Sequence, residues 1–282
     1  MLSARTIFSE IFDNDEAFAL FCSIAASGQS QAAWEKRRIA VLVPRSCRDL
    51  APKIARHGAD EDKRGRIFIA LLRHRGLVPA PVPPEADYTR RLENAGIGLA
   101  HARLRGGQEL TEREIISYLA HSWVTEQRAT GQMRALRRHA GSRPDIGRAV
   151  RMFAAEEDHQ LACYQEELLR LAAAGHAAVI ARALTAAARA EIAIHRDVGA
   201  AVMARLGRIL GWRWPRRALL AAAIQGVYLY ERLGGWQRMT SLRMPAQRNA
   251  LGAPAPARTP ARPGSPQPRL RPSPAGAMND DA

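Results

Sequence analysis

The choice of amino acids in its long segments constrains the fold of this chain more than any other feature of its sequence. Alanine, leucine, arginine, glutamate and glutamine, which are good helix formers, dominate its long segments. Alternating runs of β-branched and polar residues, which would indicate half-buried strands, are almost absent. The sequence therefore predicts an all-α fold.

Glycine, proline and capping residues divide the chain into its expected helices. Thr111 and Glu114 match a capping box at the start of one helix. The Ser-Gly-Gln-Ser stretch at 27–30 is expected to break another, and the proline-containing residues 77–110 to form a long crossover with a short helix at about 88–95. The other expected helices span about 13–26, 30–43, 49–74, 111–139, 145–174, 177–206 and 215–234.

The end of the chain differs in kind from the rest. Residues 245–282 are rich in proline, alanine and arginine and show no apolar periodicity. A segment of this composition cannot bury enough apolar surface to offset the entropy of ordering the chain. We therefore expect one helical domain over residues 1–244, followed by a disordered tail over residues 245–282.

The positive charge of the chain is carried almost entirely by arginine. The net charge is +15, yet the only lysines are Lys36, Lys53 and Lys63. A basic surface attracts nucleic acids, but arginine in an alanine-rich chain is also typical of a GC-rich coding sequence. We favour the second explanation, so a nucleic-acid partner is not expected.

Cysteine usage and hydropathy favour the cytoplasm. Three cysteines with no metal-clip spacing indicate a reducing compartment rather than a disulfide scaffold, and the first residues lack the apolar stretch of a signal peptide. The longest apolar run, residues 218–230, contains Gln225 and is shorter than the roughly 20 residues that a spanning helix needs. We therefore expect no membrane span.

A group of acidic residues and a histidine in the second half of the chain suggests a metal site. Glu126 and Glu156 lie at similar distances from the turn at 141–145, so in a helical hairpin they reach similar heights. Glu156 and His159 are three residues apart and share one helix face. Their apolar neighbours predict burial, and a buried carboxylate must be paired, protonated or bound to a metal.

The first half of the chain offers a weaker counterpart. Glu61 has apolar residues at helical spacing and His57 one turn before it, which favours an inward position. Glu35 stands beside the basic residues 36–38, so an exposed, salt-bridged face is an open alternative for it. Glu191 and His195, four residues apart, are candidates for a supporting pair that orients a metal ligand.

Three segments resemble the bacterial ferritin-like domain proteins of the di-iron carboxylate superfamily. They are Arg56-His-Gly-Ala-Asp-Glu-Asp-Lys-Arg-Gly-Arg-Ile-Phe68, Ala120-His-Ser-Trp-Val-Thr-Glu-Gln-Arg-Ala129 and Glu156-Glu-Asp-His159. The resemblance covers about residues 10–250 and implies a ferritin-like four-helix bundle with additional flanking helices. It also implies that one or two iron ions, or manganese, are bound by Glu35, Glu61, Glu126, Glu156 and His159.

One position departs from the pattern of that family. A histidine is expected at position 64, where this chain has Arg64, and a guanidinium cannot ligate a metal. Three arrangements are open: His57 supplies the nitrogen ligand, a single metal remains at Glu126, Glu156 and His159, or Arg64 pairs with the glutamates and replaces the cation.

The resemblance implies a metal-dependent oxidoreductase of the di-iron or manganese–iron carboxylate type. Such a protein would activate dioxygen or peroxide, with a small-molecule substrate that the sequence does not identify. The alternative, motivated by Arg64, is a non-catalytic ferritin-like scaffold with a degenerate metal site and a protein-binding role. A homodimer is compatible with either hypothesis.

Overall fold

The computed structural model describes residues 3–140, 143 and 146–242, except for the side chains of residues 154–159. Within this part of the chain every regular element is helical and there is no strand, which confirms the all-α prediction. The expected tail over residues 245–282 lies outside the described residues.

The first long hairpin is formed by α2 (Asp15–Leu42) and α3 (Leu50–His74). Asn14 caps α2 by accepting a hydrogen bond from the amide of Ala17 at 2.9 Å. A short helix that we did not expect, α1 (Ala4–Asp13), precedes this cap. A second short element, the 3-10 turn η1 (Arg45–Cys47), connects α2 to α3.

The expected helix break at residues 27–30 is wrong, because α2 runs through this stretch without interruption. A Cβ atom built on Gly65 of α3 would lie 3.2 Å from Oγ of Ser30. The two helices therefore approach closely at this point, and their packing outweighs the weak helix propensity of serine and glycine.

The second long hairpin is formed by α6 (Glu112–Ala140) and α7 (Gly147–Leu171). Its capping box is confirmed: the amide of Glu114 donates to Oγ1 of Thr111 at 3.2 Å, and the amide of Thr111 donates to Oε2 of Glu114 at 2.8 Å. After α7 the π-helical turn η3 (Ala172–His176) contains Gly175 with a φ of +100°, the conformation expected where this helix ends.

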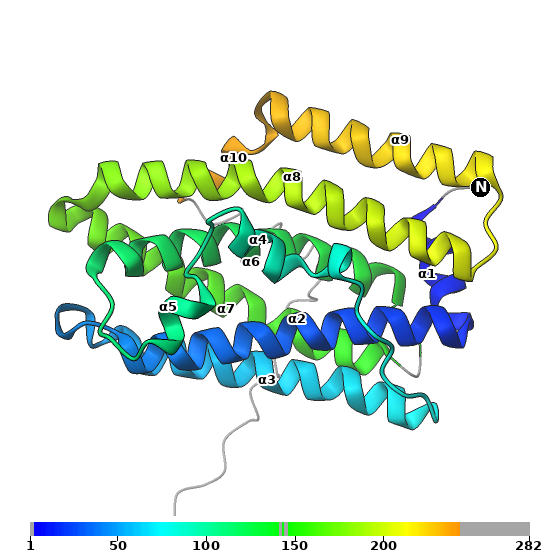
Figure 1. Ribbon diagram of the computed structural model, residues 1–282, viewed down its shortest axis with the longest axis horizontal. Coiled ribbons are helices and arrows are strands. Elements are labelled where there is room, and N and C mark those ends of the chain that lie inside the picture. Colours follow the sequence, from blue (N-terminus) through cyan, green and yellow to red (C-terminus); the bar gives the residue numbers. More distant parts are fainter. Residues whose placement is uncertain (1–2, 141–142, 144–145, 243–282) are drawn as a thin grey trace, which may run out of the picture. The chain divides into compact units, whose positions relative to one another are not determined.

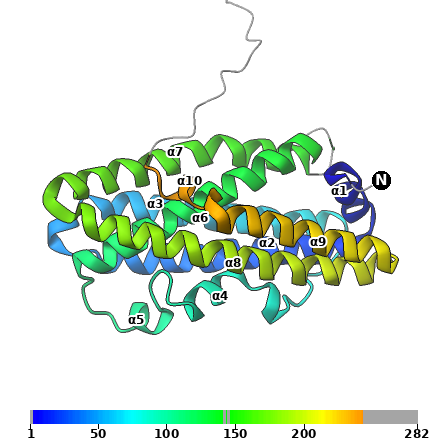
Figure 2. The ribbon, with the colours of Figure 1, turned by 90° about the horizontal axis from the view of Figure 1, so that it is seen from above.

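Between the hairpins the chain crosses over through the 3-10 turn η2 (Pro84–Ala86), α4 (Tyr88–Asn94) and α5 (His101–Arg105). The expected short helix at about 88–95 corresponds to α4, and α5 was not expected. Figure 2 shows this crossover on one side of the hairpins and α7 on the opposite side. The crossover contacts α2 and α8.

Further helices flank the two hairpins. The longest, α8 (Ala177–Ile209), packs on α6, and α9 (Trp214–Tyr230) lies on the outer side of α8 (Figure 1). The π-helical turn η4 (Glu231–Gly235) and the short α10 (Gln237–Thr240) follow. By length and composition alone, one helical stretch, Gln160–Ile209, is apolar enough to cross a membrane, although buried helices of soluble proteins can meet the same criterion.

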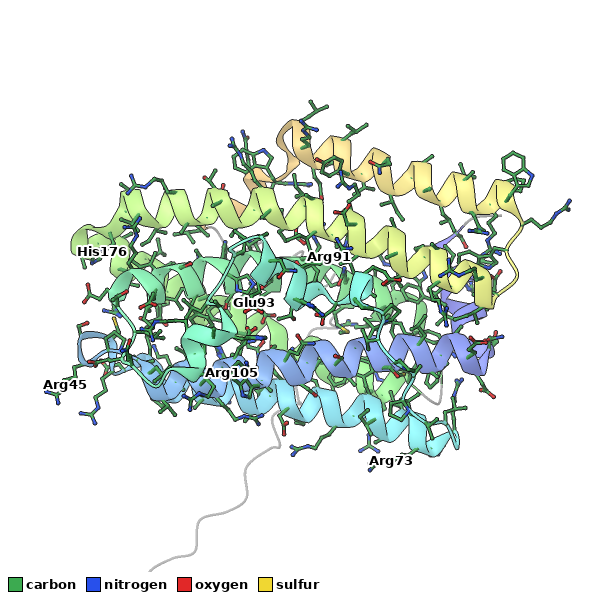
Figure 3. The ribbon with its side chains drawn as sticks, in the orientation of Figure 1. Arg45, Arg73, Arg91, Glu93, Arg105 and His176 are labelled. Carbon is green, nitrogen blue, oxygen red and sulfur yellow. The ribbon has the colours of Figure 1, made fainter. Side chains whose placement is uncertain are left out.

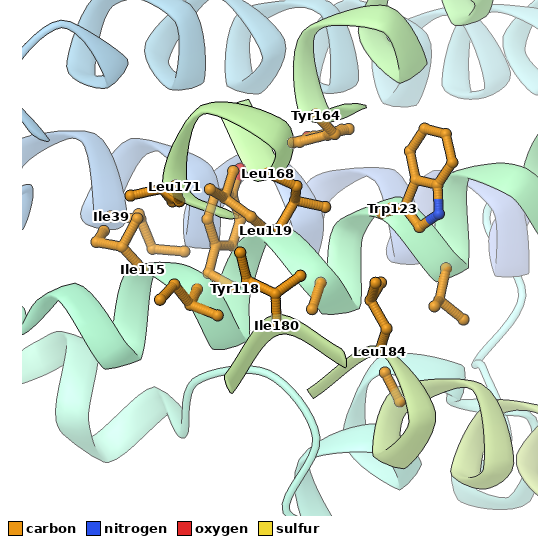
Figure 4. Packing of buried hydrophobic residues seen from close by; sticks show 14 of the residues in the cluster. Ile39, Ile115, Tyr118, Leu119, Trp123, Tyr164, Leu168, Leu171, Ile180 and Leu184 are labelled. Carbon is orange, nitrogen blue, oxygen red and sulfur yellow. The ribbon is translucent and has the colours of Figure 1, made fainter. Parts of the chain in front are cut away.

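The apolar interior forms two clusters that lie at different positions along the same helices. One cluster contains Trp123, Tyr164 and Leu168, and Figure 4 shows these side chains packed with residues of α8. The other contains Phe68 and Phe153. On α3 the first cluster ends at Ile54 and the second begins at Phe68, and on α6 they are separated by residues 125–135. Glu61, Arg64 and Glu126, which are buried and charged, lie in these intervals.

Candidate buried ionic site

A lysine ammonium lies inside the bundle, where the sequence predicted a metal. Lys36 of α2 is only 6% exposed. Its Nζ donates to Oε1 of Glu61 on α3 at 2.6 Å and lies 3.5 Å from Oε1 of Glu126 on α6. Three helices thus converge on one cation that belongs to the chain itself.

Arg64 supplies a second buried cation. Its NH1 lies 3.8 Å from Oε2 of Glu61, an oxygen that accepts no hydrogen bond from the described residues. Lys36, Glu61, Arg64 and Glu126 are called the buried ion cluster below. Two carboxylates and two cations give the cluster a formal charge of zero, which offsets part of the cost of burying each charge.

The pKa values of the two carboxyls of the cluster are shifted in opposite directions. Burial by itself would raise the pKa of Glu61, but Lys36 and Arg64 hold that pKa below its ordinary value. Burial raises the pKa of Glu126, because Lys36 is farther from this carboxyl and offsets the burial only in part. Burial opposes the charge of Lys36, yet both carboxylates together raise the pKa of its ammonium, which therefore stays charged.

A buried histidine and two buried tyrosines accompany the cluster. His57, one turn before Glu61, is 3% exposed, and a hydrogen bond of 3.3 Å joins its Nδ1 to the hydroxyl of Tyr164. The ring of Tyr118 lies edge-on to that of Tyr164 at 6.3 Å. Burial raises the pKa of both tyrosines, so their hydroxyls stay protonated. The structure thus places His57 beside the cluster, as the spacing predicted.

Glu35, another predicted ligand, is not brought to this cluster. Its Oε1 lies 2.8 Å from Nε2 of His101, and Nδ1 of His101 lies 3.3 Å from Glu93 of the crossover helix α4. Figure 3 labels Glu93 on this helix. Among the described side chains, Glu35 has no polar contact with Glu61 or Glu126. Adjacent residues of a helix face different directions, so Glu35 turns away where Lys36 turns inward.

Glu191 and His195 belong to a separate network. Glu191 is fully buried and accepts two hydrogen bonds from Arg128 of α6, at 2.8 and 2.7 Å. The same guanidinium donates to Glu231 of η4 at 2.7 Å, while His195 contacts Gln132. We call Arg128, Glu191 and Glu231 the Arg128 fork. It joins α6 to α8 and η4, and it does not orient Glu61 or Glu126.

The remaining predicted ligands, Glu156 and His159, lie within α7, which packs on α6 and α3. Their side chains are outside the described residues, so their role as metal ligands stays a prediction. Among the side chains that are described, no group of three or more histidine, cysteine, aspartate or glutamate residues could hold a metal ion.

A pair of metal ions does not fit the described half of this site. The ammonium of Lys36 occupies the space between Glu61 and Glu126, and Arg64 faces the other oxygen of Glu61. A metal bound there would have to displace a cation whose pKa is raised by the same carboxylates. Of the three arrangements open from the sequence, these residues favour replacement of the cation, with Lys36 joining Arg64 in that role.

The burial of Lys36 was missed because the residue stands in a basic run, which usually forms an exposed face. A signal for it exists in the sequence. Ala33 and Ile39, three residues to either side, are almost fully buried and share its helix face. Apolar residues at both of these spacings predict an inward position for Lys36.

No family model matches the chain, and no curated protein and no solved structure is significantly similar to it.

Proposed function

We propose that this chain is a non-catalytic helical scaffold with a protein-binding role, whose bundle is held together by the buried ion cluster in place of a pair of metal ions. The observation that carries the proposal is the position of Lys36 Nζ, 2.6 Å from Glu61 and 3.5 Å from Glu126. Oxygen chemistry at a dinuclear site needs open metal positions, and here a fixed ammonium occupies the space between two of the carboxylates.

The cluster has a structural role that suits a scaffold. A buried ion pair contributes little net stability compared with apolar packing, but breaking it leaves an uncompensated charge at a cost of about 3–5 kcal/mol. Lys36, Glu61 and Glu126 come from three helices. A helix that slid by one turn would lose its partner, so the cluster fixes the register of α2, α3 and α6.

Elemental analysis of the intact protein tests this proposal. Protein produced in iron- and manganese-supplemented medium is expected to contain neither metal in stoichiometric amount. The variant Lys36→Met/Arg64→His removes both cations and introduces the histidine of the ferritin-like pattern, so it is expected to gain metal. One or two metal ions per chain in the natural protein would show that the scaffold proposal is wrong.

A metal-dependent oxidoreductase of the di-iron or manganese–iron carboxylate type is the second candidate. Glu61 and Glu126 converge in the bundle interior from two helices, and α7, which carries Glu156 and His159, packs against both. If the protein binds iron or manganese and acts on a small molecule with dioxygen or peroxide, Glu156→Ala should abolish both metal content and turnover. Unchanged metal stoichiometry in this variant would eliminate the candidate.

A further inference from the structure

From residue 218 to its end, helix α9 is apolar on all sides, yet only one side of it is covered. Residues 218–230 contain no charged side chain, and none of the residues of α9 is buried. Its half-buried residues Leu220, Ile224 and Tyr228 recur every fourth position and form the stripe that faces α8. A helix that is hydrophobic all round is typical of a buried environment, so the uncovered side of α9 needs an explanation.

The opposite side of α9 forms an exposed apolar face. We call Leu219, Ala222, Gly226, Leu229, Tyr230 and Leu233 the α9 outer face. Its large side chains are 53–88% exposed. In the part of the chain that the structure describes, six of the ten exposed large hydrophobic side chains lie between Trp214 and Leu233. Such a concentration is typical of an interaction surface, whereas scattered exposed hydrophobics are ordinary.

Exposed arginines stand at both ends of this face. Arg213 precedes the face and Arg232 and Arg238 follow it, and the guanidinium of Arg238 is 5.3 Å from the ring centre of Tyr230. Arg217, by contrast, has its stem against Gly207 on the α8 side. The only acidic residue between positions 198 and 242 is Glu231, which is bound to Arg128. Glu10 of α1 also reaches the start of α9, where it is bound to Arg216. The surface around α9 is therefore both apolar and rich in arginine.

This combination argues against two possible occupants of the face. A second copy of the chain, paired through the same helix in either direction, would bring arginines against arginines. Residues 243–282 offer only Met244, Leu251, Leu270 and Met278 as large apolar side chains and carry further arginines. Neither occupant would satisfy the charge and the apolar area together.

An anionic lipid surface would satisfy both. A helix in the membrane interface buries leucine at the boundary of the acyl chains, while arginine meets the headgroups and tryptophan and tyrosine lie at headgroup level. Trp214, 77% exposed, and Tyr230, 60% exposed, stand near the two ends of α9. Nucleic acid would pair with the arginines but would leave the leucines in water.

We propose that the α9 outer face docks on a membrane surface that contains anionic phospholipid, with α9 lying in the plane of the interface. The inference goes beyond the proposed scaffold function and uses a different part of the fold from the buried ion cluster. A negative result for either proposal therefore leaves the other standing.

Co-sedimentation of the full chain with lipid vesicles tests the inference. The probes are vesicles of phosphatidylcholine alone and of phosphatidylcholine with phosphatidylglycerol. The test variant is Leu229→Gln/Leu233→Gln, and the matched control is Val41→Gln/Val78→Gln, which makes the same kind of change at two other exposed sites, 74% and 79% exposed. Neither variant changes the net charge, and circular dichroism verifies that both fold.

The natural protein and the control are expected to bind the phosphatidylglycerol vesicles, less strongly as salt is raised. The α9 variant should bind about tenfold or more weakly, since two leucines no longer enter the lipid. Absence of vesicle binding, or equal binding by the α9 variant, would overturn the inference. Two other results would also overturn it. One is a dimer of the natural protein, seen by light scattering, that is absent in the α9 variant, while neither protein binds vesicles. The other is binding to nucleic acid without binding to vesicles.

Discussion

The Nζ of Lys36 and Oε1 of Glu61 lie 2.6 Å apart inside the hairpin of α2 and α3, and both side chains are less than 10% exposed. Lys36→Met keeps most of the apolar stem but leaves two buried carboxyls without their ammonium. We expect the free energy of unfolding in urea to fall by about 3–5 kcal/mol.

Lys53 provides the matched control for this substitution. It also pairs with a buried glutamate, Glu167, but the lysine side chain is 41% exposed, and Glu167 keeps a second cation, Arg170, at 2.8 Å. Lys53→Met should therefore cost less than about 1 kcal/mol. Equal losses in the two variants would contradict the distinction between a buried lysine and a partly exposed one.

The second prediction concerns acid stability and His121. Burial lowers the pKa of His121 to about 4, and the charge of Lys36 contributes to the shift. His121 takes up its proton at a higher pH in the unfolded chain than in the folded chain. Its neutral form therefore contributes fully to the free energy of unfolding above about pH 6.5, and this contribution is lost as the pH falls towards 4. Between pH 7 and pH 5 this residue should account for a loss of at most about 2 kcal/mol.

Urea denaturation of His121→Gln at both pH values measures this contribution, because the variant has no imidazole to protonate. Its stability should change less between pH 7 and pH 5 than that of the natural protein. His74→Gln, a substitution at an exposed position at the end of α3, should keep the natural profile. A His121→Gln profile that matches the natural one would refute the assignment.

The third prediction concerns Gly98, which packs against His121. Its φ is +81°, and a Cβ atom there would lie 2.9 Å from Nδ1 of His121. Gly98→Ala should therefore cost about 2–3 kcal/mol, from backbone strain together with steric overlap. Gly96 has a φ of +70° and open space around it, so Gly96→Ala should cost only the backbone part, about 1 kcal/mol. Thermal denaturation separates the two, and equal shifts would count against the close contact.

The fourth prediction concerns the Arg128 fork. Arg128→Met leaves Glu191, which is fully buried, and Glu231 without a cation, and we expect a loss of about 3–5 kcal/mol. Because the fork ties α6 to η4, amide hydrogen exchange in α9 should also become faster. Arg189→Met, on an exposed arginine 4.8 Å from the ring of Trp236, should cost about 1 kcal/mol or less. Unchanged exchange in α9 would show that the fork does not hold this helix.

Most of the helices could be predicted from the sequence because their signals are local. The capping box at Thr111 marks the start of a helix through a contact three residues away. Gly175 marks the end of another through its own backbone conformation. The break expected at residues 27–30 failed because the deciding contact, Ser30 against Gly65, joins two helices. Propensity describes one segment, and it gives way where packing between segments is tight.

The site was predictable only in part, for the same reason. Glu61 and Glu126 are buried, as their apolar neighbours indicated. Ala33 and Ile39 indicate locally that Lys36 faces inward, but no local pattern identifies its partners, which lie 25 and 90 residues away. Glu35 was predicted to be a ligand because of its place in a family pattern. It is one residue away from the inward-facing Lys36, so its side chain points in another direction, towards His101.

The buried lysine also changes what the cell must provide for this fold. A metallocentre is completed only after synthesis, by a delivered ion that a chelator can remove or a competing metal can replace. For Glu61 and Glu126 the counter-ion is Lys36, which leaves the ribosome as part of the chain. Their pairing therefore requires no maturation step and does not vary with metal starvation or excess.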